Sequence, residues 1–235
     1  MQIAFYAARI QALVSQEVER LEAAYETYPD STMFWCFIDL VGSSNYRIVH
    51  GPREGYVRGE SFFTLVRGVI APVSSIRLIK EMGDAVFLAA PSFRPLLEAV
   101  LLCDQVAYQL TGVVGTSDFP FGIRAGIGFG VAKRLMRTHD DFLGSSIDQL
   151  SRVMSVRSDK SNILVHEDAY TPSAEIIEEY ADFLSVSEVS RVSSSSAKGM
   201  LKNVFYRELY VDRSRFSSYR SNFAQWDPSR SSATD

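Results

Sequence analysis

The chain has 235 residues, of which 46% are hydrophobic and 22% charged, and its 24 Lys and Arg against 28 Asp and Glu give a net charge of -4. A chain of this size and composition can bury one substantial core without disulfides or a structural metal. The acidic balance argues against nucleic acid as a partner held by bulk charge. No apolar run approaches the roughly 18 residues that cross a bilayer, and the N-terminus lacks signal-peptide features, so we expect a cytoplasmic protein without a membrane partner.

The cysteines and histidines indicate neither disulfide nor zinc chemistry. Cys36 and Cys103 lie inside apolar runs, which is typical of buried thiols. His50, His139 and His166 show no metal-ligand spacing with each other or with the cysteines.

The first elements follow from hydrophobic periodicity. Apolar positions from Tyr6 to Leu21 recur at intervals of three and four, which predicts a helix reaching about Thr27 that packs on the domain or contacts a second copy. Residues 32–41 (TMFWCFIDLV) are β-branched and aromatic almost throughout and predict a central buried strand. The Gly-Ser-Ser that follows offers a turn and a cap, so we expect a helix to begin near Ser44.

The rest of the chain alternates between helical and extended patterns. It predicts a helix over 54–70, a hairpin of strands over 75–81 and 85–90, a helix over 96–110, a strand over 121–132, a helix over 145–156 and strands over 163–165 and 204–211. This order is typical of a ferredoxin-like, palm-type α+β fold, with an antiparallel-rich mixed sheet and helices packed on it. We therefore expect an N-terminal helix (1–30), one main domain (31–211) and a flexible Ser- and Arg-rich tail (212–235).

Two acids stand out in these surroundings. Asp39 lies near the end of the predicted central strand, and Asp84 lies at the tip of the predicted hairpin, so the two carboxylates can converge. For either acid alone, a solvated strand end or a turn residue would be the simpler interpretation. An unpaired carboxylate is costly among apolar residues, and two such groups suit Mg²⁺ or Mn²⁺ ions that bridge phosphates. The backbone amides of residues 40–44 lie where a helix begins, which favours phosphate oxygens.

Five further segments carry a family resemblance. Residues 37–44 (FIDLVGSS) resemble the F-x-D-[IL]-x-G-F-[TS] motif of class III nucleotidyl cyclases. The five further segments that resemble motifs of this family are 79–84 (IKEMGD, similar to K-x-x-G-D), 124–130 (RAGIGFG, similar to R-x-G-I-x-x-G), 141–152 (DFLGSSIDQLSR, similar to D-x-x-G-x-x-V-N-x-A-x-R), 163–165 (ILV) and the late Lys198-Gly199. Each segment alone is a weak signal, but their shared order makes the match specific.

The resemblance implies a head-to-tail homodimer with active sites at the interface, which converts a nucleoside triphosphate into a 3',5'-cyclic monophosphate and pyrophosphate. It implies two Mn²⁺ or Mg²⁺ ions per site, held by Asp39 and Asp84 with Leu40. The segment implied to bind the substrate phosphates is Leu40, Val41, Gly42, Ser43 and Ser44.

The resemblance also implies catalytic residues from the partner chain. Arg152 would stabilise charge on the α-phosphate, and Lys198 would be a second phosphate contact. The chain departs from the family where Asp148 replaces the usual ribose-orienting Asn, where Ser43 replaces an aromatic residue, and where Leu150 and the serine after it replace small residues. These departures put ribose positioning in question and indicate a divergent member.

The base-reading positions implied by the resemblance are Lys80 and Asp141. A donor and an acceptor can read adenine or cytosine in one order and uracil or guanine in the other, so the base stays open. A catalytic core preceded by one helix is similar to the stand-alone pyrimidine cyclases of Pycsar antiphage systems, which make cyclic UMP or cyclic CMP for a separate effector. Tyr46 is then a candidate for packing on the smaller base.

Other functions fit less well. A diguanylate cyclase would have Gly-Gly-Asp-Glu-Phe where this chain has residues 81–85 (EMGDA), and no G-x-x-x-x-G-K-[ST] motif of a P-loop NTPase occurs. The remaining alternatives are an adenylate cyclase and a degenerate cyclase-like domain that binds nucleotide or a partner without turnover. Loss of the Asn at Asp148 favours the degenerate domain, whereas Asp39, Asp84 and Arg152 argue for an active enzyme.

Overall fold

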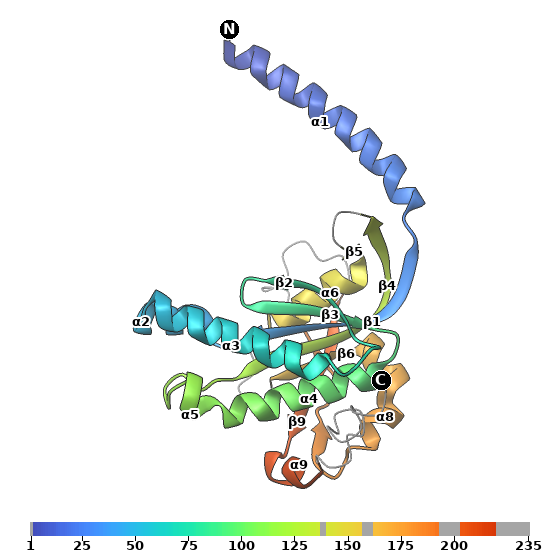
Figure 1. Cartoon of the computed structure of the whole chain (residues 1–235). Helices are drawn as coiled ribbons and strands as arrows, with labels where there is room; N and C mark the ends of the chain where they lie inside the picture. Colours follow the sequence, from blue (N-terminus) through green and yellow to red (C-terminus); the bar gives the residue numbers. More distant parts are fainter. Residues whose placement is uncertain (1, 137–139, 157–161, 193–202, 220–235) are drawn as a thin grey trace, which may run out of the picture.

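The computed structural model describes residues 2–136, 140–156, 162–192 and 203–219, which build one sheet with helices on both faces (Figure 1). In chain order, the elements are α1 (Gln2–Thr27), β1 (Asp30–Leu40), α2 (Ser43–His50), α3 (Pro52–Ile70), β2 (Arg77–Met82), β3 (Ala85–Ala90), α4 (Phe93–Gln109), α5 (Thr111–Val114), β4 (Ile123–Met136), β5 (Asp140–Leu143), α6 (Ser145–Met154), β6 (Ile163–His166), α7 (Glu167–Tyr170), a 3₁₀ turn (Thr171–Ser173), α8 (Ala174–Glu178), β7 (Leu184–Val186), β8 (Ser190–Arg191), β9 (Phe205–Val211) and α9 (Arg213–Tyr219). The prediction of an α+β fold with an N-terminal helix is confirmed.

The sheet is mixed and mostly antiparallel. Its strands are hydrogen-bonded in the order β2-β3-β1-β4-β6-β9-β7, with β5 paired to β4 and β8 paired to β9. Among the described pairs, β4 and β6 run parallel and the others are antiparallel. β1 lies between β3 and β4, and near its end Asp39 stands between Ala85 and Arg124.

The middle of the central strand, residues 33–38, is apolar because both of its faces are covered there. Phe34, Cys36 and Ile38 join the larger core, which α3 and α4 cover, whereas Trp35 and Phe37 belong to a smaller cluster beneath α6. The prediction of core thiols is also confirmed, since both cysteines are free and buried, and burial raises the pKa of each thiol.

Helix α6 packs tightly on β4. A Cβ atom at Gly126 would lie 2.6 Å from the Sδ atom of the flexible Met154 side chain, and one at Gly130 would lie 2.8 Å from the Cβ atom of Ser146, close to the helix backbone. These glycines therefore allow α6 to approach β4 closely.

Helix α1 extends away from the sheet (Figure 1). The apolar positions that predicted this helix stay exposed in the single chain, with Ile10 60%, Val14 56% and Leu21 42% accessible. No helix in the described ranges is long and apolar enough to cross a membrane.

The last described helix corrects one prediction. Arg213–Tyr219 forms α9 rather than the start of a flexible tail, because Phe216 is fully buried and Arg213 donates two hydrogen bonds of 3.0 and 3.1 Å to the carboxylate of Asp104. The Ser- and Arg-rich composition concealed these two anchors. Residues 220–235 lie outside the described part of the chain.

Candidate active site

Two carboxylates meet where β1 ends beside the β2–β3 hairpin. Asp39 pairs with Ala85, the first residue of β3, and Asp84 directly precedes that residue. The Asp84 carbonyl accepts a 3.0 Å hydrogen bond from the Leu40 amide. Gly83 has φ 63°, a left-handed conformation that favours glycine and turns the hairpin tip toward β1. The structure therefore brings the two acids together.

The position of Asp39 is electrostatically unfavourable for a carboxylate. Burial and the neighbouring Asp84 raise the pKa of the Asp39 carboxyl to about 6, although Arg124 and the Leu40 amide oppose the increase. Desolvation and a nearby like charge both favour neutralisation of the group. Protonation of Asp39 or binding of a cation beside it would each reduce this electrostatic cost.

The donor set fits a hard divalent cation. Carboxylate oxygens of Asp39 and Asp84, with the backbone of Leu40 between them, are the ligands that Mg²⁺ and Mn²⁺ prefer. Within residues 2–136, 140–156, 162–192 and 203–219, no three His, Cys, Asp or Glu side chains cluster so as to enclose a metal by themselves. A metal site here would therefore be open, with water and substrate oxygens completing the coordination shell.

The turn after β1 forms one wall of a cavity of about 200 Å³. Gly42 has φ 69°, and α2 begins directly after it. The Ser43 hydroxyl donates a hydrogen bond to the Asp84 carboxylate, which joins the turn to the hairpin. The lining residues are Leu40, Ser43, Ser44, Arg47, Gly55, Gly59, Gly83 and Asp84. Because amides in the first turn of a helix lack internal partners, this wall suits phosphate oxygens.

A buried arginine that the sequence analysis missed holds this turn. Arg58 is 1% exposed, and its terminal nitrogens donate hydrogen bonds of 2.8 to 3.2 Å to the carbonyls of Val41, Val114, Phe119 and Pro120. Four carbonyl dipoles offset much of the cost of burying the charge. Because Val41 lies two residues after Asp39, Arg58 ties the acid-bearing turn to α3 and to the loop before β4. The sequence signal that could have indicated its burial is that Arg58 lies one helical turn before the apolar Phe62, on the same face of the helix.

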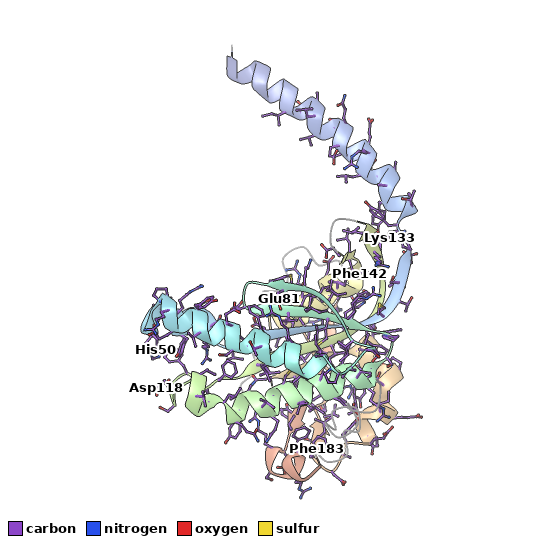
Figure 2. The ribbon with its side chains drawn as sticks, in the orientation of Figure 1. His50, Glu81, Asp118, Lys133, Phe142 and Phe183 are labelled. Carbon is purple, nitrogen blue, oxygen red and sulfur yellow. The ribbon has the colours of Figure 1, made fainter. Side chains whose placement is uncertain are left out.

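Tyr46 supports this arginine instead of lining the cavity. Its ring is 8% exposed and lies 4.5 Å from the Arg58 guanidinium and 4.3 Å from the His50 ring, between ring centres. Figure 2 shows His50 next to the loop that carries Asp118, and Phe119 of this loop packs against both rings. Tyr46 is not among the described residues that line the cavity.

The two base-reading candidates lie side by side. The Lys80 Nζ atom is 2.7 Å from Asp141 Oδ1, and the Phe142 amide donates a 2.9 Å hydrogen bond to the same oxygen. Both side chains are partly accessible, at 40% and 28%. Strand β5, which the sequence analysis did not predict, brings Asp141 to the hairpin; Figure 2 labels Phe142 on β5 and Glu81 on β2.

The register of the β2–β3 hairpin directs Lys80 toward Asp141. Counted from the tip, Met82 pairs with Ala85 and Lys80 with Phe87, and directly paired residues of antiparallel strands share a face. The register shifts only beyond Lys80, at a β-bulge between Leu78 and Lys80. Lys80 therefore shares the face of Phe87 and β5, whereas Glu81 reaches the opposite face and accepts hydrogen bonds of 2.6 and 2.7 Å from Arg67 of α3.

Helix α6 presents the catalytic candidates Asp148 and Arg152. They are four residues apart, so they share a side of the helix, while Leu150 and Val153 are buried against the sheet. Asp148 is exposed and Arg152 is half-buried. Both polar side chains therefore lie on the accessible side of α6. Lys198 lies outside the described residues.

Taken together, the sheet order, the acid pair and the helices define a fold class. The chain has the class III adenylate and guanylate cyclase fold. It is similar to the adenylyl cyclase CyaB of P. aeruginosa (TM-score 0.61, 14% identity, 80% of this chain and 97% of that chain). It is also similar to an adenylate/guanylate cyclase/hydrolase of Silicibacter pomeroyi (TM-score 0.60, 14% identity, 79% and 99% covered) and to the guanylyl cyclase Cya2 (TM-score 0.55, 19% identity, 77% and 93% covered).

Sequence comparison points in the same direction. The chain is 35% identical over 122 residues to the pH-sensitive adenylate cyclase MT1302 of Mycobacterium tuberculosis, strain CDC 1551 / Oshkosh. The match covers 51% of this chain and 27% of that relative, so the chain spans about a quarter of the relative's length. No protein-family model matches the chain.

Proposed function

We propose that the protein is a nucleotidyl cyclase that converts a nucleoside triphosphate into a 3',5'-cyclic nucleotide and pyrophosphate. The observation that carries this proposal is the meeting of Asp39 and Asp84 at the end of β1, next to a cavity that Asp84, Ser43 and Ser44 line. Two acids at a strand end would repel each other without a cation, and the helix start next to them suits the phosphates that such a cation accompanies.

The reaction requires positioning and charge stabilisation. The ribose 3'-hydroxyl loses its proton to solvent, its oxygen forms a bond to the α-phosphorus, and the bond from that phosphorus to the bridging oxygen breaks, so that pyrophosphate leaves with the electron pair. Two divalent ions, when bound, acidify the 3'-hydroxyl and neutralise phosphate charge. Asp39, Asp84 and Leu40 would hold these ions, and the turn from Val41 to Ser44 would orient the phosphates.

We assign the remaining roles to the partner subunit of a head-to-tail homodimer. Arg152 of the second copy stabilises charge on the α-phosphate, Lys198 makes a further phosphate contact and Asp148 positions the ribose. The accessible position of Asp148 and Arg152 on α6 supports their contact with a second molecule.

Mixing two inactive variants tests the shared site. Asp39→Ala and Arg152→Ala chains, each inactive alone, regain roughly a quarter of wild-type activity when mixed equally, because half of the dimers carry one intact site. Absence of rescue in mixed dimers shown to form argues against sites shared between subunits.

For the base we propose a pyrimidine, with UTP or CTP as substrate and the cyclic product as a second messenger that acts on a separate effector in antiphage defence. This rests on the resemblance to the pyrimidine cyclases of Pycsar systems and on the adjacent donor and acceptor, Lys80 and Asp141. The second candidate is an adenylate cyclase, which the similarity to MT1302 favours.

Incubation of the purified protein with Mn²⁺ and each of ATP, GTP, CTP and UTP, followed by chromatography, separates these functions. A cyclic pyrimidine nucleotide supports the first candidate and cyclic AMP the second. If none of the four is cyclised, the proposal of a cyclase fails and a degenerate, nucleotide-binding domain becomes the better explanation.

A further inference from the structure

The positively charged side chain of Arg47 also lines the cavity. Arg47 lies on α2, three and four residues after Ser44 and Ser43, so the three side chains share one side of the helix. All three line the same cavity as Asp84. The cavity therefore carries a carboxylate at one wall and a guanidinium at another.

The guanidinium of Arg47 has no partner among the described residues. No hydrogen bond or ion pair joins it to any residue that the structure describes, although its side chain lines a cavity that contains Asp84. A guanidinium presents its donors as a planar fork that matches two phosphate oxygens. An open arginine in such a cavity is suited to an anionic ligand.

Helix α3 leaves room for this arginine. A Cβ atom at Gly55 would lie 2.9 Å from both Cβ and Cγ of Arg47, so the bare backbone forms the surface on which the arginine stem rests. At Gly59, which also lines the cavity, a Cβ atom would have no neighbour within 4 Å. Glycine is unfavourable inside a helix, yet both positions fall where a side chain would displace Arg47 or enter the cavity.

We propose that Arg47 binds the terminal phosphates of the nucleoside triphosphate, the part that leaves as pyrophosphate. The inference rests on the proposed function and assigns a substrate-binding residue to the same site. Metal ions at Asp39 and Asp84 would neutralise the phosphates at one wall of the cavity. The backbone amides at the start of α2 would donate hydrogen bonds to the same phosphates, and Arg47 would bind the terminal end of the triphosphate. Negative charge grows on the leaving group as its bond to the α-phosphorus breaks, so the contact also favours cleavage.

Binding of inorganic tripolyphosphate, measured by isothermal titration calorimetry with Mn²⁺ present, tests the assignment without any turnover. Arg47→Gln shortens the side chain and removes its charge, and we expect it to weaken binding about tenfold or more, whereas Arg47→Lys keeps a charge without the fork and falls in between. The matched control is Arg53→Gln, since Arg53 is an exposed arginine of the neighbouring α3 that does not line the cavity.

A second pair of variants leaves Arg47 unchanged. Gly59→Leu places a side chain in the cavity and should weaken tripolyphosphate binding about tenfold. Gly68→Leu, at an exposed glycine of the same helix that also has no neighbour within 4 Å, should leave it unchanged. Thermal unfolding establishes that the variants are folded.

The outcomes separate this inference from the proposed function. Weaker binding in Arg47→Gln but not in Arg53→Gln supports the inference even if no nucleotide is cyclised. Equal binding by both variants, or no binding of tripolyphosphate by the wild-type protein, overturns it even if a cyclic nucleotide forms.

Discussion

The two charged regions of this chain are built on opposite principles. At the end of β1, two carboxylates are held together, with Ser43 bonded to one of them and burial raising the pKa of the other. On the neighbouring hairpin, Lys80 and Asp141 neutralise each other at 2.7 Å. In the first region Arg124 offsets the two carboxylates only in part, so the region gains by binding a cation, whereas in the second region the charges already neutralise each other and a ligand must compete with that ion pair. We infer that the first region provides binding energy for the metal and phosphates, and that the second region selects the base.

The largest expected effect is loss of turnover when the acid pair is broken. Asp39→Ala or Asp84→Ala should lower the rate of cyclic nucleotide formation by about 10²- to 10³-fold or more, because each removes a charge that we propose to hold the metal. Product chromatography measures the rate and circular dichroism the fold. The control is Asp118→Ala, at an exposed loop acid away from the cavity. Normal activity in either acid variant would remove the metal assignment.

The next effect concerns the arginine that fixes the acid-bearing turn. Arg58→Met leaves buried carbonyls without donors and should lower the free energy of unfolding by about 2 to 4 kcal/mol. Urea unfolding measures the loss, and Arg53→Met on the same helix, at an exposed arginine, should change it by less than about 0.5 kcal/mol. Equal losses in the two variants would show that Arg58 does not anchor the turn.

A smaller effect should follow pH. An unperturbed Asp has a pKa of 3.8, and that of Asp39 is raised to about 6, so the folded metal-free protein retains a proton that the unfolded chain releases. The stabilisation of the folded state by this bound proton is complete below pH 3.8 and is lost as pH rises through about 6. Asp39→Asn should therefore exceed wild type in Tm by a few degrees above pH 6, and the difference should disappear as pH falls to 3.8.

Calorimetry across pH gives the Tm difference, and comparing the two proteins removes the contribution of other titrating groups. His166 is such a group, because burial lowers its pKa and its neutral form favours the folded state as pH rises. Mn²⁺ should raise the Tm of the wild type more than that of the variant. A Tm difference that does not change with pH would contradict the assignment.

The smallest effect on stability belongs to the satisfied pair. Lys80→Met should change the free energy of unfolding by less than about 1 kcal/mol, since the ion pair is partly exposed. It should nevertheless shift the ratio of kcat/KM among the four triphosphates about tenfold. Unchanged ratios in Lys80→Met and Asp141→Asn would mean that this pair does not read the base.

How far the sequence predicts this molecule depends on whether the stabilising contacts are local. Strand β3 and the middle of β1 are apolar runs, and the hydrophobic pattern alone predicts them. Strand β5 holds two acids in four residues and forms only because β4 extends beyond its expected end to pair with it. Its position decides the surroundings of Asp141, which local propensity could not indicate.

The same distinction applies to the candidate site. Asp39 and Asp84 are visible because each is an acid in an unusual local setting. Arg58 draws its partners from three separate stretches of the chain, and Arg47 acquires its setting from glycines of the next helix. Neither arrangement leaves a local pattern, so both required the structure.

The bulge in β2 has a consequence for aligning this chain with others. The direction of Lys80 depends on the number of residues between it and the hairpin tip, because Met82 pairs with Ala85 and Lys80 with Phe87, and the bulge lies on the other side of Lys80. A homologous hairpin without the bulge residue would therefore keep its lysine on the β5 side, whereas one with a residue fewer between the lysine and the tip would turn the lysine toward the α3 side. When sequences are aligned by motif, a gap before Lys80 leaves the face of the lysine unchanged and a gap after it does not.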